Sequence, residues 1–141
     1  MREILFRGQR INNGEWMYGL PCRTLNKAGE DVLNIQCWER EKDGVTGIYD
    51  AVAPETIGQY TGLTDKNGNK IFEGDIVKAQ DDIFGSPFCN GITGKIVYAE
   101  TAFFIEPKNP MKSQWLFNEC AVYEVIGNIH DNPELLKEDD N

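Results

Sequence analysis

Short runs of β-branched and aromatic residues alternate with chain-reversing residues along most of this sequence. Each run ends at Gly, Asn, Asp or Pro after about eight to twelve residues, a spacing typical of antiparallel sheets and barrels. Two Asn-Gly pairs, Asn13-Gly14 and Asn67-Gly68, separate apolar runs, and this pair favours the type I′ hairpin turn. The sequence therefore predicts a mostly β fold, a compact and barrel-like antiparallel sheet.

The clearest predicted hairpin lies in the centre of the chain. Its arms are residues 57–63 and 71–72, and the turn Glu73-Gly74-Asp75 then precedes a strand that begins at Ile76. Further strands are predicted at 4–11, 16–20, 32–38, 95–98, 103–105 and 122–126. Residues 47–54 are predicted to be an irregular connection, because Pro54 interrupts both helix and central strand. Residues 81–93, rich in Gly and Phe, are predicted to be a long surface loop and the loop best suited to function.

The C-terminal region carries the start signals of a helix. Asn132 precedes Pro133 and Glu134, which predicts an N-cap, a proline at the first helical position and a favourable acid near the positive helix end. Leu135 and Leu136 would dock this short C-terminal helix. A length of 141 residues fits one domain, and a single domain over 1–141 is predicted.

The charge balance restricts the partners. A formal net charge of -9 disfavours non-specific binding to nucleic acids and anionic membranes. The apolar stretches are far shorter than the roughly 18 residues of a membrane-spanning helix, and no export signal is visible, so a cytoplasmic location is predicted. In that compartment the four cysteines, Cys22, Cys37, Cys89 and Cys120, are expected to be free thiols.

Three segments resemble the YopX family. They are the opening 2–7, the central 57–68 continuing to 71–77, and the closing 123–129, although Gly8-Gln9 departs from the pattern expected after the opening arginine. The resemblance implies a compact barrel-like β fold with a small helical cap, encoded mainly by bacteriophages and prophages. It implies no catalytic residue, because the family has no assigned active site.

Four residues form a candidate surface site: Asp65, Glu73, Asp75 and His130. Carboxylates and a histidine suit acid-base chemistry or a divalent metal, but turn formation also explains the acids. A calcium loop beginning at Asp65 fails, because Lys70 and Ile76 stand where Gly and Glu are needed. No nucleotide-binding or serine-hydrolase motif is found, and neither a cofactor nor a metal is predicted.

Two other sets of residues bear on ligand class. The basic residues predicted to form one patch are Arg2, Arg7, Arg10, Lys66, Lys70 and Lys78. Trp16, Trp38 and Trp115, with Phe103 and Phe104, suit either base stacking or core packing, and the scarcity of nearby basic residues favours the core.

The leading hypothesis is a non-catalytic module of phage origin that binds proteins or itself. Exposed strand edges predict a homo-oligomer, and a host or phage protein is the expected further partner. The alternatives are a nucleic-acid-associated phage accessory protein that uses the basic patch, or a small metal-dependent hydrolase that uses Glu73, Asp75 or Asp65.

Overall fold

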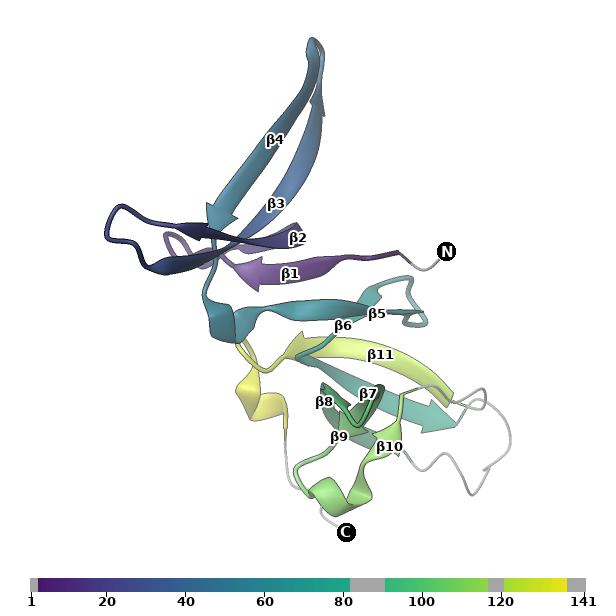
Figure 1. Cartoon of the computed structure of the whole chain (residues 1–141). Helices are drawn as coiled ribbons and strands as arrows, with labels where there is room; N and C mark the ends of the chain where they lie inside the picture. The colour runs from purple at the N-terminus through teal and green to yellow at the C-terminus, as the bar shows by residue number, and fades with distance from the viewer. Residues whose placement is uncertain (1–2, 82–90, 117–120, 137–141) are drawn as a thin grey trace. The chain divides into compact units, whose positions relative to one another are not determined.

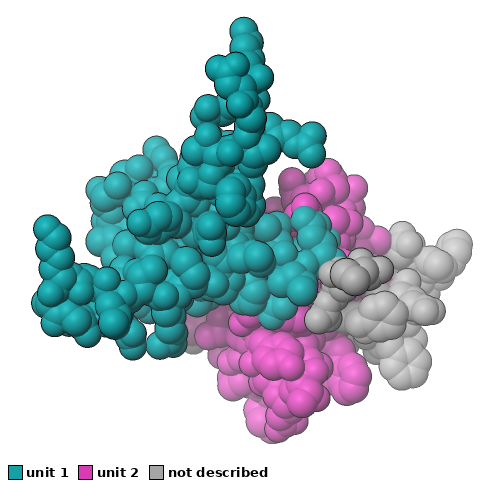
Figure 2. All heavy atoms as spheres, turned by 45° about the horizontal axis from the view of Figure 1, so that its top comes forward, with its two compact units in different colours: residues 1–60 teal, residues 61–141 magenta. Residues whose placement is uncertain are grey.

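The computed structural model describes residues 3–81, 91–116 and 121–136. The chain divides into two compact units, Met1–Tyr60 and Thr61–Asn141, and each has its own buried cluster (Figure 2). One domain over the whole chain remains a prediction, and the two units are described separately below. The predicted loop 81–93 falls mainly on residues outside the described part, as do Arg2, Cys89 and Cys120.

Unit 1 is an antiparallel sheet built from consecutive strands (Figure 1). Its elements are β1 (Phe6–Gln9), β2 (Trp16–Leu25), β3 (Asp31–Glu41), β4 (Gly44–Ala51), the 3-10 helix η1 (Pro54–Thr56) and the first part of β5 (Gly58–Thr64). The strand order is β4-β3-β2-β1-β5, so β4 forms the outer edge. Met17, Ile35 and Val52 are buried at the centre of the unit, and Phe6 and Ile48 pack against them.

Unit 2 holds a second antiparallel sheet, of order β10-β9-β8-β7-β11. Its elements are β6 (Lys70–Phe72), β7 (Asp75–Asp81), β8 (Ile92–Ala99), β9 (Ala102–Glu106), η2 (Pro110–Lys112), β10 (Gln114–Trp115), β11 (Ala121–Asn128) and η3 (Pro133–Leu135). The last part of β5, which also belongs to this unit, lies beside β6. Ile71, Val77, Ile96 and Ile105 are almost fully buried in its core.

The mostly β prediction is confirmed, but the predicted barrel is wrong. Within the described residues neither sheet closes: β4 is an edge in unit 1, and β10 and β11 end the sheet of unit 2. In unit 1 the reason lies in the pairing register. β2 pairs only with the first part of β3, up to Gln36, whereas β3 and β4 pair with each other as far as Glu41 and Gly44. The outer parts of β3 and β4 therefore continue as a two-stranded ribbon instead of curling back.

The predicted C-terminal helix is also wrong, because the described residues there contain only the single 3-10 turn η3. Asn132 makes no side-chain cap bond to that turn. Its Oδ1 instead accepts a hydrogen bond from the backbone N–H of Asn128 (3.3 Å), which ties the turn to the end of β11.

The irregular connection predicted at 47–54 is wrong over residues 47–51, because Gly44–Ala51 is strand β4. The prediction of core packing is likewise wrong for Trp38 and Trp115, which are exposed.

The hairpin between β8 and β9 is confirmed, and its two central residues, Glu100 and Thr101, both have positive φ, the type I′ pattern. At the two Asn-Gly pairs only Gly14 and Gly68 have positive φ, so the type I′ prediction there is wrong.

Candidate functional site

Asp65 is a buried carboxylate at the turn between β5 and β6, with 6% of its surface exposed. It accepts hydrogen bonds from the backbone N–H groups of Asn67 (2.9 Å), Asn69 (2.8 Å) and Val125 (3.0 Å), and from Nδ2 of Asn69 (3.2 Å). Burial raises the pKa of Asp65, but the bonds from Val125, Asn69 and Asn67 outweigh it and hold the pKa below its ordinary value. Asp65 therefore closes its own turn and fastens that turn to β11.

Lys66 strengthens the same junction. Its backbone N–H donates to the carbonyl oxygen of Tyr123 (2.9 Å), and its Nζ lies 3.3 Å from Oε2 of Glu124 on β11. Both oxygens of Asp65 already accept hydrogen bonds from within the unit, so the geometry is that of a structural carboxylate.

The other acidic candidates lie at a second turn. Asp75 is buried, and its Oδ2 accepts from the backbone N–H of Phe72 (2.8 Å) across Glu73 and Gly74, whose φ is 86°. The carbonyl oxygen of Gly74 accepts from the N–H of Ile129 (2.9 Å), which brings the residue before His130 beside this turn.

His130 is half-buried, and its own N–H donates to Oδ1 of Asn128 (3.0 Å). The structure therefore places the Glu73–Asp75 turn and the chain at His130 side by side, while Asp65 contacts β11 further along, at Val125. Over the described ranges, no group of three or more His, Cys, Asp or Glu side chains is arranged to hold a metal ion. The assignment of Asp65, Glu73, Asp75 and His130 to one surface site remains a prediction.

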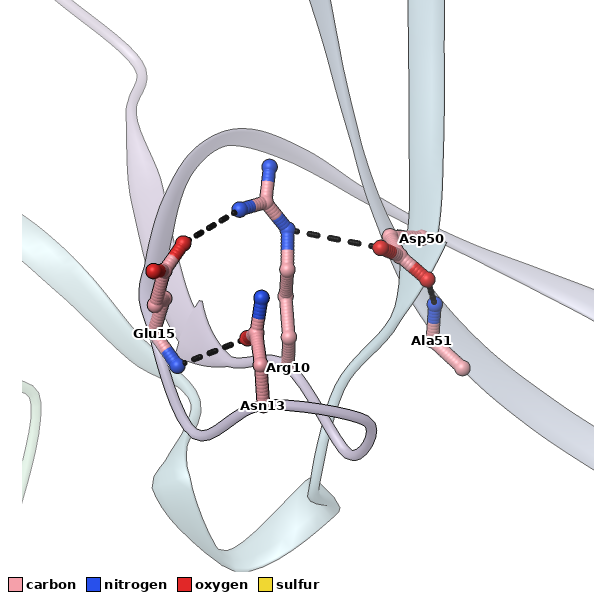
Figure 3. Close-up of polar contacts among 5 residues, drawn as sticks. All are labelled: Arg10, Asn13, Glu15, Asp50 and Ala51. Carbon is pink, nitrogen blue, oxygen red and sulfur yellow. Dashed lines mark hydrogen bonds and ion pairs between the residues drawn. The ribbon is translucent and has the colours of Figure 1, made fainter.

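Arg7 and Arg10, two members of the predicted basic patch, are engaged within unit 1. Arg7 is 6% exposed, and its guanidinium carbon lies 4.5 Å from the centre of the Trp16 ring. Arg10 lies between two carboxylates, with Nη1 3.3 Å from Glu15 and Nε 3.4 Å from Asp50 (Figure 3). Arg10 thus joins the turn after β1 to the end of β4.

The other described members of the predicted basic patch lie in unit 2. Lys66, Lys70 and Lys78 are exposed, and Lys78 is the Cα partner of Glu124, the residue that also pairs with Lys66. Acidic neighbours therefore offset part of this positive charge. A single patch of Arg7, Arg10 and the three lysines remains a prediction.

A surface that sequence reasoning missed lies on β2, β3 and β4. The pairs Leu20 with Gln36 and Gln36 with Tyr49 form one row across the three strands, and Trp38 is opposite Gly47. Because strand side chains alternate, these residues point away from the buried Ile35. We call this surface the outer face. Its large apolar members are Tyr18, Leu20, Trp38, Val45 and Tyr49.

The outer face exposes its aromatic residues strongly. Trp38 is 68% exposed, Tyr49 65% and Val45 60%. A Cβ added to Gly47 would lie 2.8 Å from the Trp38 ring, so this ring packs directly over the glycine. The sequence holds a signal for the outer face: Val45, Ile48 and Tyr49 put apolar side chains on both faces of one strand.

In the described part of the chain, no helix is long and apolar enough to cross a membrane.

Comparison with known proteins relates most of the chain to one family and to solved structures, among them the two described below. A family model described as YopX protein matches residues 5–137. The crystal structure of protein EF1440 from Enterococcus faecalis is 27% identical, with a TM-score of 0.54 over 97% of this chain and 100% of that one. The structure of protein yopX from Bacillus subtilis is 18% identical, with a TM-score of 0.53 over the same shares, and shows the likeness of fold. A search of curated proteins finds no match.

Proposed function

Because the chain belongs to the YopX protein family, which carries no stated activity, we propose a function from its own surface: a non-catalytic module that binds proteins through the outer face. The observation that carries this proposal is the exposure of Trp38, Tyr49 and Val45 on one face of one sheet. Large exposed apolar clusters on small proteins mark interaction surfaces, and Trp and Tyr supply much of the binding energy at protein interfaces.

Charge supports a protein partner over a nucleic acid. Arg40 is the basic residue that the register places on this face beside Val45, whereas the tip of the β3–β4 hairpin carries three acids, Glu39, Glu41 and Asp43, with Lys42 between the last two. Aromatic platforms for single-stranded nucleic acids normally lie among basic residues that follow the backbone. An acidic molecule with an apolar face instead suits a protein, of phage or host origin or a second copy, whose apolar surface has a neutral or basic rim.

Replacing Trp38 by threonine is expected to weaken binding about 30-fold, since a central interface tryptophan contributes about 2 kcal/mol or more. Threonine keeps strand propensity while it removes the ring. The measurement is photo-crosslinking in the bacterial host, with a photoreactive amino acid at Gln36, which lies in the outer-face row between Leu20 and Tyr49.

Trp115→Thr is the matched control, because Trp115 is also 68% exposed and packs edge-on against Phe104 in unit 2. The proposal expects a discrete protein adduct that Trp38→Thr removes and Trp115→Thr keeps. If no adduct forms, or if both variants lose it equally, the outer face is not the binding surface. Thermal unfolding of each variant shows whether the fold is retained.

A further inference from the structure

The outer end of β3 and β4 is a two-stranded ribbon. β2 pairs with β3 only up to Gln36, so residues 37–41 and 44–48 continue past β2 with no third strand among the described residues (Figure 1). In the space-filling view unit 1 carries narrow projections (Figure 2). An isolated two-stranded ribbon is only marginally stable in water, and a further strand or a packed face is what normally stabilises one.

The backbone of β4 has a hydrogen-bonding edge on its outer side. The N–H of Val52 donates to Leu33 of β3 (3.0 Å), whereas the carbonyl oxygen of Ala51 accepts from Ile11 (3.0 Å), on the other side of the strand. Because the backbone groups of an antiparallel strand alternate in direction, Val45, Gly47 and Tyr49 direct their N–H and C=O groups outward, as Ala51 does.

This edge lacks the features that normally prevent strand addition. Residues 45–49 contain no charge and no proline, in a chain of which 26% is charged. Edge strands of monomeric proteins are usually protected by lysine, proline, bulges or covering loops. Among the described residues this edge is first covered at Ala51, whose carbonyl oxygen accepts a hydrogen bond from the N–H of Ile11.

We propose that the β4 edge pairs with the β4 edge of a second copy of this chain, antiparallel and about a two-fold axis at Gly47. This inference rests on the proposed function, since it names the partner of the ribbon that carries the outer face. In this register Gly47 is opposite Gly47 of the other copy, and Val45 is opposite Tyr49. All outward N–H and C=O groups of these three residues then find partners across the axis.

Three observations favour a second copy over a foreign peptide. At one end the free edge stops at Ala51, whose carbonyl oxygen accepts from Ile11, and at the other end it stops at the Lys42-Asp43 turn. These two limits fix the register in which Val45, Gly47 and Tyr49 are all used. Val45 and Tyr49 form an apolar cross-strand pair on the same face in both copies. The local absence of charge also lets two acidic molecules approach at this strand, despite a net charge of -9 on each.

Sedimentation equilibrium of the purified full chain tests the pairing. The wild type is expected to dimerise reversibly, and more strongly at higher salt, because salt screens the repulsion between two acidic chains. Tyr49→Pro and Tyr49→Thr form a matched pair: both remove the ring, but only proline removes the outward N–H. Because that N–H is not used in the β3–β4 ladder, proline is compatible with the fold there.

The expected result is at least tenfold weaker dimerisation for Tyr49→Pro than for Tyr49→Thr, with circular dichroism unchanged for both. A wild type that stays monomeric at every concentration, or two variants that associate equally, overturns the proposal. Monomeric protein with a crosslinked foreign partner would reject the second copy and keep the proposed function. A dimer that crosslinks to nothing through the outer face would reject the proposed function itself.

The register has its own measurement. A nitroxide at Asp43, attached through an unnatural keto amino acid so that the native cysteines are kept, reports the distance between copies by pulsed electron paramagnetic resonance. Residue 43 would lie opposite residue 51, so the two Asp43 positions are separated by eight residues, about 27 Å at roughly 3.4 Å per residue. A register shifted by one hydrogen-bonded pair changes this separation by about 7 Å and overturns the axis at Gly47.

Discussion

Replacing Asp65 by alanine is expected to lower the free energy of unfolding by about 4 kcal/mol, because it removes a buried carboxylate and leaves three partly buried N–H donors without their acceptor. The carboxylate accepts from Asn67, Asn69 and Val125, and so joins the turn between β5 and β6 to β11. Urea unfolding of the wild type and the variant measures the loss. Asp31→Ala is the control: Asp31 is exposed and lies 3.8 Å from Arg23, so it should cost less than about 1 kcal/mol.

Asp65 also predicts how stability depends on pH. Its folded pKa lies below the ordinary value of 3.8, so its stabilising contribution is fully present above about pH 4 and is lost as the pH falls through the lower folded pKa. The Asp65→Asn variant lacks this titrating group and should show a smaller loss of stability over that acidic range. If wild type and variant lose stability in parallel on acidification, Asp65 is not the stabilising carboxylate described above.

Gly19→Ala is the second substitution with a large expected effect. A Cβ at Gly19 would lie 2.0 Å from the backbone oxygen of Gln36, so β2 and β3 must separate to make room. We expect a loss of about 3 kcal/mol, at the upper end for overpacking, because the obstacle is backbone and not a flexible side chain. Thermal and urea unfolding provide the measurement.

Gly91→Ala is the matched control. The nearest atom to a Cβ at Gly91 would be the Ala79 oxygen at 3.6 Å, an ordinary contact. This change should alter stability by less than about 0.5 kcal/mol. If both substitutions change the free energy of unfolding equally, the close approach of β2 and β3 does not restrict the size of the side chain at position 19.

The chain reversals are readable from the sequence because their requirement is local. Gly14, Gly68 and Gly74 have φ values of 74°, 83° and 86°, which glycine adopts at little cost. The turn type is not readable, because neighbouring side chains help to set it. Asn13 accepts from the N–H of Glu15 (2.9 Å) and Asp65 accepts from Asn67, and at each pair only the glycine has positive φ.

Strand β4 could not be predicted from local sequence patterns, and the reason is physical. Gly47 interrupts its apolar pattern, Pro54 follows shortly after its end, and glycine inside a strand normally weakens it. The Trp38 ring packs over Gly47 from the neighbouring strand, and that contact becomes visible only when the register is known. Side chains alternate along β3, so Trp38 and the buried Ile35 lie on opposite faces of the sheet, and hydrophobicity alone wrongly predicts that Trp38 is a core residue.

The predicted charge sites show a similar limit. Arg7 and Arg10 are counted as free positive charge in the sequence, yet one is buried against Trp16 and the other lies between Glu15 and Asp50. Asp65 and Asp75 read as turn residues, and each indeed accepts backbone hydrogen bonds at its turn. The bond from Val125 to Asp65 joins residues 60 positions apart, a contact that no local pattern predicts.

Amide hydrogen exchange along β4 tests the central claim, that its edge beside the outer face is a binding surface. Val45, Gly47 and Tyr49 direct their N–H groups outward, whereas those of Thr46 and Ile48 bond to β3 and serve as internal controls. We predict that the three outward amides gain protection as protein concentration rises, and that Val45 and Gly47, whose N–H groups remain in Tyr49→Pro, lose this protection in that variant. Outward amides that exchange at unprotected rates at every concentration, while Thr46 and Ile48 stay protected, would contradict the claim.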